Sequence, residues 1–312
     1  MTTMTLLYYH PQFLHHETGQ HPECAERLRQ VIDHLEVSGW LGRVDRPTWQ
    51  AAATEPIVRV HTPDHLAALD ALVARGGGRA DADTVVSPAS VDVARLGAGA
   101  LCDAVARVIS GPEQQALCLV RPPGHHALAE RAMGFCLFNN VAVAAAAALD
   151  HGLERILIVD WDVHHGNGTQ AIFYDDPRVG FFSVHRWPFY PGTGDSTETG
   201  AGDGLGSTRN VPVPFGTSRQ EYQSRVLSEL EDFAGRIQPE LVLVSAGFDS
   251  HREDPIGSLG LEVEDFAWLT DAARDTASAF AGGRLVSTLE GGYNPPVLAE
   301  CVATHLGSLL RA

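Results

Sequence analysis

Five short apolar runs, each followed at once by polar, glycine-rich residues, limit most strongly what this chain can fold into. Runs of this length and composition are typical of strands that are buried on both faces of a parallel sheet. The carboxyl ends of parallel strands meet at one edge of the sheet, and ligands bind outside that edge. We therefore predict one shared cleft there. The runs span residues 116–120, 155–159, 179–184, 241–245 and 285–289.

Helical patterns lie between these runs. Four segments repeat apolar residues at helical spacing or are rich in alanine, and the longest begins with a capping box, in which Ser218 precedes Glu221 by three residues. The alternation of strands and helices predicts an α/β fold with three layers, in which helices cover both faces of a mainly parallel, doubly wound sheet. The predicted helices are residues 24–37, 63–73, 140–149 and 217–237.

Length and composition favour one enzyme-sized domain, residues 1–312. The 44% hydrophobic content is enough for a large core, and neither a low-complexity linker nor a repeat of solenoid period divides the chain. The N-terminal residues lack the basic and apolar regions of a signal peptide, and no apolar run is long enough to span a bilayer. We therefore expect a cytoplasmic protein with no membrane partner.

The five cysteines are scattered and form no C-x-x-C pair, which argues against a disulfide framework and a structural zinc knuckle. The formal net charge of −17 disfavours direct binding to nucleic acid or to anionic lipid, although such acidity also serves solubility alone. The oligomeric state stays open, a homo-oligomer included.

Potential metal ligands follow the run at 155–159. Asp162 and His164 are two residues apart, so in an extended segment both side chains point the same way. Such a pair alone is more often a capping Asp beside a surface His than a metal site. Other strand ends carry further titratable side chains. The run at 116–120 leads to Arg-Pro-Pro-Gly-His-His, and the run at 241–245 leads to Asp249.

Six segments from these strand ends and loops resemble, in the same order, the active-site blocks of the zinc-dependent histone deacetylase and acetylpolyamine amidohydrolase superfamily. The resemblance extends from about Tyr9 to about Asn294, and Asn167 together with the R-P-P-G opening is more similar to the class II branch than to class I. It implies the arginase/deacetylase fold. The segments are R-P-P-G-H-H-A, G-F-C-L-F-N-N, D-W-D-V-H-H-G-N-G-T, F-Y-P-G-T-G, S-A-G-F-D-S and E-G-G-Y-N.

The resemblance implies a catalytic zinc ion held by Asp162, His164 and Asp249, which leaves one coordination position open. It makes His125 and His126 the proton-transfer pair, with one accepting a proton from the attacking water and the other assisting departure of the amine. The sequence does not decide which histidine is the general base.

Three further residues complete this machinery by resemblance. Asp160 would orient His125, and Asn167 would orient His126. Tyr293, which follows two glycines, would donate a hydrogen bond to the oxyanion of the tetrahedral intermediate.

The resemblance also implies a narrow substrate channel. Phe135 and Tyr190 match its two aromatic walls, and the carbonyl of Gly134 would lie near the amide. Ile256 stands where class II deacetylases often have Leu and where some polyamine-selective relatives have Glu. Asp83 and Thr84 match contacts at the channel rim.

Structural potassium ions are a further implication. The inner site matches Asp160, Asp162, His164, Ser183 and Val184, mostly through carbonyl oxygens. The outer site matches Phe173, Asp176 and Val179.

We therefore predict a zinc-dependent amidohydrolase that removes acetyl groups from acetyl-lysine-like linear amines. Acetylpolyamine hydrolysis is the main alternative, and a carboxylate in the loop of Glu17 and Glu23 would then read the distal amine. A two-manganese ureohydrolase is disfavoured because no further Asp follows His165 at the needed spacing. A non-catalytic acyl-lysine reader is disfavoured because Tyr293 and all three ligands are present. The choice among acetylated lysine, peptide and polyamine stays open.

Overall fold

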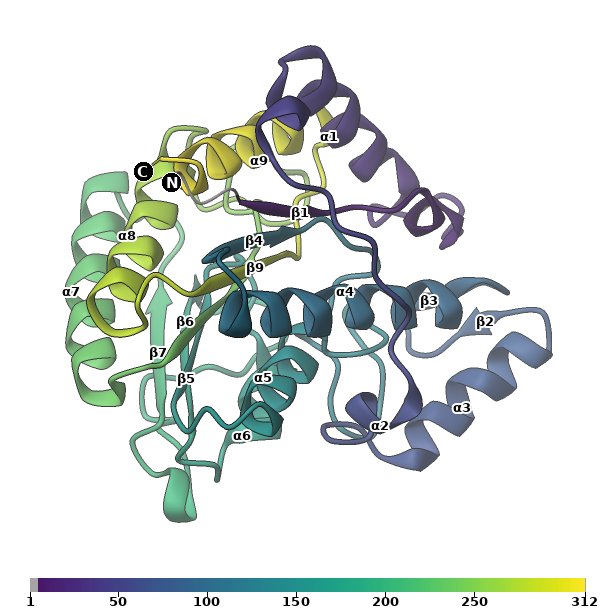
Figure 1. Cartoon of the computed structure of the whole chain (residues 1–312), viewed down its shortest axis with the longest axis horizontal. Helices are drawn as coiled ribbons and strands as arrows, with labels where there is room; N and C mark the ends of the chain where they lie inside the picture. The colour runs from purple at the N-terminus through teal and green to yellow at the C-terminus, as the bar shows by residue number, and fades with distance from the viewer. Residues whose placement is uncertain (1–4, 312) are drawn as a thin grey trace.

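A seven-stranded sheet forms the centre of the protein (Figure 1). The structure is a computed structural model and describes residues 5–311. The strand order is β1-β4-β9-β8-β5-β6-β7, and every neighbouring pair is parallel. The strands are β1 (Leu6–Tyr8), β4 (Gln115–Cys118), β5 (Ile156–Asp160), β6 (Val179–Arg186), β7 (Thr208–Val213), β8 (Leu241–Ala246) and β9 (Leu285–Leu289).

Helices cover both faces of this sheet, which confirms the predicted three-layer α/β fold (Figure 1). Helices α4 and α5 pack on one face, whereas α7 and α8 pack on the other, and α9 lies between α8 and α1. A short antiparallel pair, β2 (Gly78–Arg79) with β3 (Val85–Val86), stands apart from the sheet. The helices are α1 (Ala25–Val37), α2 (Thr54–Ile57), α3 (Pro63–Ala74), α4 (Ser90–Ser110), α5 (Asn140–Asp150), α6 (Asn167–Phe173), α7 (Arg219–Ile237), α8 (Asp265–Phe280) and α9 (Pro295–Leu309).

All five apolar runs form strands, and the four predicted helices are present with ends that shift by one or two residues. At the start of α7, the Ser218 hydroxyl accepts a hydrogen bond from the Glu221 amide, as the capping box requires. The strand β7 escaped prediction because its polar residues and Pro212 are typical of an edge strand rather than a buried one. Within residues 5–311, no helix combines the length and apolarity needed to cross a bilayer.

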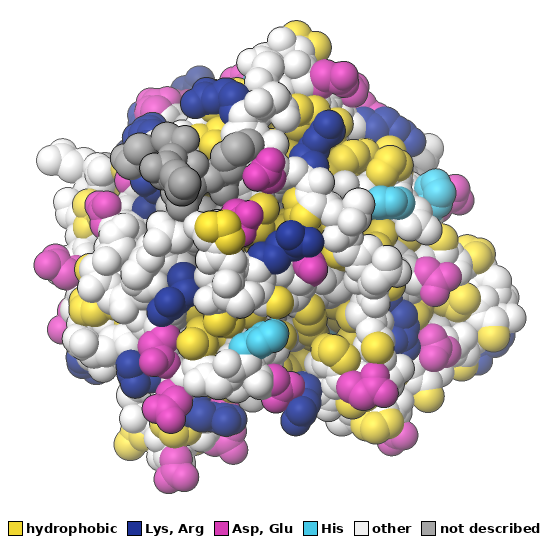
Figure 2. Space-filling view, in the orientation of Figure 1, with side chains coloured by type: hydrophobic (Ala, Val, Ile, Leu, Met, Phe, Trp, Pro, Cys, Tyr) yellow, Lys and Arg dark blue, Asp and Glu magenta, His cyan; other side chains and the backbone are white. Residues whose placement is uncertain are grey.

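The charged side chains and the cysteines are distributed as follows. Acidic and basic side chains are interspersed over the face drawn in Figure 2. All five cysteines are free, as their spacing predicted.

A buried ion pair fastens the N-terminal segment to the strand end that carries the two adjacent histidines. Glu23 is fully buried, and its carboxylate accepts a hydrogen bond of 2.8 Å from Arg121, which also donates to the Phe13 carbonyl at 2.9 Å. Arg27 from α1 donates to the same carboxylate at 3.3 Å. Burial opposes the charge on Glu23, but Arg121 and His16 hold its pKa well below the usual value.

Removing this carboxylate should destabilise the fold strongly. We expect Glu23→Ala to lower the free energy of unfolding by about 3–5 kcal/mol, because it leaves buried guanidinium groups without a counter-charge. The matched control is Glu26→Ala, three residues further on in the first turn of α1, which breaks an exposed pair with Arg29 and should cost less than about 1 kcal/mol. Chemical denaturation measures the free energy of unfolding of both variants. Equally small losses in the two variants would contradict the role assigned to Glu23.

Candidate active site

The carboxyl ends of the central strands bring Asp162, His164 and Asp249 together. Asp162 and His164 follow β5, and Asp249 follows the neighbouring strand β8. One potential ligand atom from each of the three residues lies within 4.8 Å of the others. The His164 Nδ1 atom is 3.0 Å from a carboxylate oxygen of Asp162 and 3.1 Å from one of Asp249. All three side chains are buried.

This group has the composition and the surroundings of a cation site. Two carboxylates are buried side by side, and the Oδ2 atom of Asp249 accepts no hydrogen bond among the described residues, although the His164 Nδ1 atom lies 3.1 Å from it. Burial raises the pKa of Asp249 to about 7, and the nearby charge of Asp162 adds to the shift. A bound cation would balance the charge of the carboxylates and coordinate the free lone pairs of Asp249 Oδ2, so the residues fit a metal ion.

Glycines make room for the two carboxylates. A Cβ atom on Gly291 would lie 2.2 Å from Asp249 Oδ2, and one on Gly247 would lie 2.1 Å from Asp162 Oδ2. The Gly291 amide instead donates to Asp162 at 2.8 Å, and the Val163 amide donates to Asp249 at 2.9 Å. Backbone amides therefore hold the carboxylates in place.

His125 and His126 lie beside this group, with ring centroids 4.0 Å apart. The Nδ1 atom of His125 is 2.9 Å from an oxygen of the buried Asp160 carboxylate. The Nδ1 atom of His126 is 2.7 Å from the side-chain oxygen of Asn167. The two orienting contacts that the resemblance implied are thus present.

Different partners shift the pKa values of the two imidazoles in opposite directions. Burial opposes the charge on His125, but Asp160 and Asp162 outweigh it and raise the pKa to about 10. For His126, burial and then the charges of His125 and His164 lower the pKa well below the usual value. Within this pair, the shifts therefore favour a charged His125 and a neutral His126 at neutral pH.

Tyr293 is buried beside the metal group at the end of a glycine pair. Its amide donates to Asp254 at 2.6 Å, and the Arg27 guanidinium lies 4.9 Å from the centroid of its ring. The same guanidinium donates to the Gly292 carbonyl at 2.6 Å. Burial raises the pKa of Tyr293 well above the usual value, so its hydroxyl stays protonated and can donate a hydrogen bond.

A cavity of about 240 Å³ leads to these groups. The predicted channel residues Gly134, Phe135, Tyr190 and Ile256 all line it, together with Asp83, His126, His164, Phe189 and Tyr293.

Several close contacts shape the cavity wall. Phe135 has a left-handed backbone with φ of 69°, and its ring lies edge-on to Tyr293 with centroids 5.6 Å apart. A Cβ atom on Gly134 would approach His126 Cδ2 to 2.4 Å, so only glycine allows this segment to pass so close to the imidazole.

The two predicted rim residues lie in different environments. Asp83 lines the cavity, whereas Thr84 is completely buried and its hydroxyl accepts a hydrogen bond of 3.1 Å from the Phe135 amide. Thr84 therefore supports the aromatic wall, and its prediction as a rim contact was wrong.

The residues matched to potassium sites fall into two places. Ser183 on β6 is paired in register with Asp160 on β5, so the inner group lies next to the metal group. Phe173 ends α6 and Val179 begins β6, and the Asp176 amide between them donates to the Phe173 carbonyl at 3.1 Å.

Sequence reasoning missed two residues of this site. The Phe189 ring stacks on the His164 imidazole with centroids 5.2 Å apart, and its place beside Tyr190 in F-Y-P-G-T-G was the available signal. Glu290 is fully buried and accepts hydrogen bonds from the amides of Gly124 and His125 at 2.6 and 3.2 Å. Burial raises the pKa of Glu290 to about 7.

Comparison with known proteins agrees with this geometry. The Histone deacetylase domain family matches residues 21–309. A histone deacetylase-like amidohydrolase of Pseudomonas aeruginosa is 40% identical over 90% of this chain and 74% of its own length. The human polyamine deacetylase HDAC10 is 42% identical over 93% of this chain and 45% of its own length. The crystal structure of the HDA15 HD domain superposes with a TM-score of 0.94 at 35% identity, covering 99% of this chain and 89% of that one.

The protein is therefore a hydrolase with the fold of the deacetylases. The chain belongs to the histone deacetylase family, and deacetylase or amidohydrolase activity is its function.

Glu290 gives a test of how the histidine pair is held. Glu290→Ala leaves two backbone amides beside the pair without an acceptor, which should cost about 1–3 kcal/mol of stability. We expect kcat/KM to fall by about 10- to 100-fold, as is usual when an outer support of a site is lost. Glu290→Gln keeps one acceptor oxygen, so it should retain most of the stability and most of the kcat/KM of the wild type. Wild-type stability and turnover in Glu290→Ala would refute this role.

Proposed function

We propose that residues 1–312 form a single zinc-dependent deacetylase domain that hydrolyses acetyl-lysine-like linear amides. The observation that carries the proposal is the buried Asp162–His164–Asp249 group at the inner end of a cavity lined by aromatic rings. An unbranched acyl amine fits such a cavity, because its methylene stem can lie between the rings while its amide reaches the metal group.

Asp162, His164 and Asp249 would hold the zinc ion, since two carboxylates and one imidazole supply three ligands of the kinds that zinc accepts. When bound, zinc polarises the acyl carbonyl and makes water acidic enough to act as a nucleophile. Within residues 5–311 this is the one such group of three close ligands, which favours a single metal over the pair that a ureohydrolase needs.

The two histidines would divide the proton transfers. His126 is neutral and would accept the proton of the attacking water, while Asn167 holds its ring. His125 is charged through Asp160 and would stabilise the developing negative charge, and the pair would deliver a proton to the departing amine. The sequence left this assignment open, and the opposite pKa shifts support it.

Tyr293 would donate its hydroxyl proton in a hydrogen bond to the oxyanion. Its phenol stays protonated in the buried site, and the close approach of Gly291 to both carboxylates places the Tyr segment beside the metal group.

The neutral Ile256 supports acetyl-lysine over acetylpolyamine as the substrate, and the carboxylate that the cavity does contain is Asp83. Ile256 is neutral, so this position offers no counter-charge to a distal ammonium. Glu23 cannot replace it, because the structure buries that carboxylate against Arg121. The similarity to a relative named polyamine deacetylase keeps acetylpolyamines as the alternative substrate class.

Two further proposals rest on the resemblance. Potassium would bind at the inner group around Asp160 and Ser183 and at the outer group around Phe173 and Asp176. The five free thiols are compatible with the reducing cytoplasm that we expect for this protein.

Changing Asp249 should remove metal and activity together. Three ligands leave no redundancy, so Asp249→Ala should lose both bound zinc and turnover. Elemental analysis measures the zinc, and an acetyl-lysine peptide assay measures turnover. Asp83→Ala removes a carboxylate from the same cavity and should keep its zinc. An Asp249→Ala protein with full zinc content would disprove the ligand set.

Tyr293→Phe should keep zinc and fold while kcat falls by about 10²- to 10³-fold, which is the usual effect of removing one oxyanion donor. Steady-state kinetics with zinc content measured on the same sample test this. A wild-type kcat would show that the hydroxyl takes no part in the chemistry.

Ile256→Glu should shift specificity toward polyamines. A partly buried carboxylate near a distal ammonium contributes about 1 kcal/mol, whereas the diffuse surface charge is screened beyond about 8 Å. The measurement compares kcat/KM for acetyl-lysine peptides, N-acetylputrescine and N8-acetylspermidine, with Ile256→Gln as the neutral control. A wild type that prefers polyamines by about tenfold or more would overturn the acetyl-lysine assignment.

A further inference from the structure

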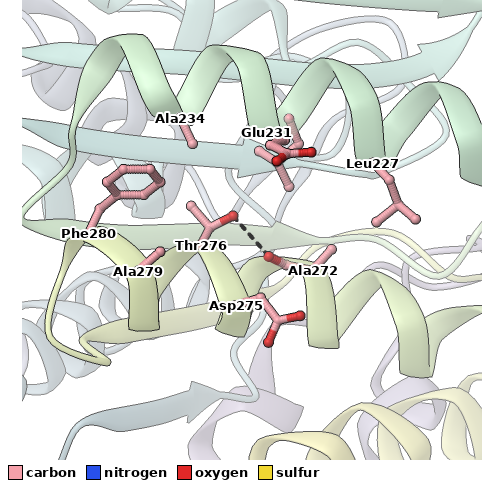
Figure 3. A pocket seen from close by; sticks show the side chains of 9 residues that line it. Leu227, Glu231, Ala234, Ala272, Asp275, Thr276, Ala279 and Phe280 are labelled. Carbon is pink, nitrogen blue, oxygen red and sulfur yellow. Dashed lines mark hydrogen bonds between the residues drawn. The ribbon is translucent and has the colours of Figure 1, made fainter.

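A second hollow lies between α7 and α8, with a volume of about 430 Å³ (Figure 3). Residues three, four and seven apart share one face of a helix. On α7 this face carries Leu227, Glu231 and Ala234, and on α8 it carries Ala272, Thr276 and Ala279. The two faces form the walls of a groove.

The interior of this groove is apolar. Leu230 and Ala234 are buried at its base. The Thr276 hydroxyl donates to the Ala272 carbonyl at 2.9 Å, so its hydrogen bond is made within α8 (Figure 3). Leu227 and Phe280 lie toward opposite ends of the groove, and they are 41% and 36% exposed. Side chains of this size and exposure offer apolar anchoring points.

The walls carry negative charge. Glu231 on α7 and Asp275 on α8 line the groove from opposite sides, and both are exposed. Among residues 5–311, neither carboxylate has an ion-pair partner. The nearby cations are engaged elsewhere, because Arg236 pairs with Asp232 and Arg274 pairs with Asp271.

We propose that this groove docks a basic amphipathic segment of a partner protein. An apolar base between two carboxylates is complementary to a helix whose apolar residues are flanked by Lys or Arg. A second copy of this chain does not match, because the net charge of −17 and the acidic walls would repel it. An anionic membrane surface is excluded by the same charges.

The groove is separate from the catalytic cavity. Its residues come from the middle and the C-terminal halves of α7 and α8, whereas the catalytic cavity lies at the carboxyl ends of the strands. The two cavities share no lining residue. A docked partner would therefore leave the catalytic entrance open, and turnover of a small substrate should not change.

The test uses a fluorescent peptide of about 18 residues, built from leucine and lysine so that it forms an amphipathic helix. A control peptide has glutamate in place of every lysine. Fluorescence anisotropy should show saturable binding of the lysine peptide alone by the full chain. Glu231→Lys/Asp275→Lys should weaken binding by at least about 10-fold, and Leu227→Gln should weaken it as well. Asp33→Lys/Glu36→Lys on α1 makes the same change in net charge at exposed positions and should bind within about 2-fold of wild type.

Three outcomes would overturn the proposal. Equal weakening in both double variants would show general attraction to an acidic protein. A dissociation constant above about 1 mM for wild type would show that the groove is not a docking site. Self-association that Leu227→Gln abolishes, measured by sedimentation velocity, would assign the groove to a second copy of the chain. Activity on a small acetyl-lysine substrate, equal in all variants, confirms that each one is folded.

Discussion

The burial of two carboxylates side by side is the constraint on which the active site depends. Asp162 and Asp249 are both removed from water, and an isolated buried charge is costly unless it is paired or coordinated. The pKa of Asp249 rises to about 7 as a result, and its Oδ2 atom accepts no hydrogen bond among the described residues, although His164 Nδ1 lies 3.1 Å away. Two glycines allow the carboxylates to come this close, and backbone amides orient them. A cation resolves the conflict, which explains why such a group persists in a protein core.

The same electrostatic field separates the roles of two adjacent histidines. His125 and His126 differ in their neighbours, because one contacts a carboxylate and the other a neutral amide. Their pKa values move in opposite directions although both rings are buried. One fold thus provides an acid and a base at the same pH. Glu290 holds the turn that carries the two histidines, because its carboxylate accepts hydrogen bonds from two backbone amides of that turn.

Much of this organisation could be predicted from the sequence because it depends on local patterns. The buried strands are continuous apolar runs, and the residues just after Val159 and Ser245 reach the active-site edge in any parallel arrangement. The edge strand β7 and the long helix α4 were not predicted, since the polar residues of β7 and the glycines of α4 weaken their signals. Thr84 was misplaced because its burial depends on how the loop before β3 packs against Phe135. Glu290 looked like one polar residue before two glycines, and its role depends on a turn 166 residues away in the chain.

X-ray absorption spectroscopy at the zinc edge tests the central claim most directly. Our account predicts one zinc ion per chain, with nitrogen and oxygen ligands at about 2.0–2.2 Å and no sulfur ligand. Removal of that ion by a chelator should abolish deacetylation, and added zinc should restore it. A sulfur shell at about 2.3 Å, or a second metal at about 3.5–4 Å, would contradict the single site at Asp162, His164 and Asp249.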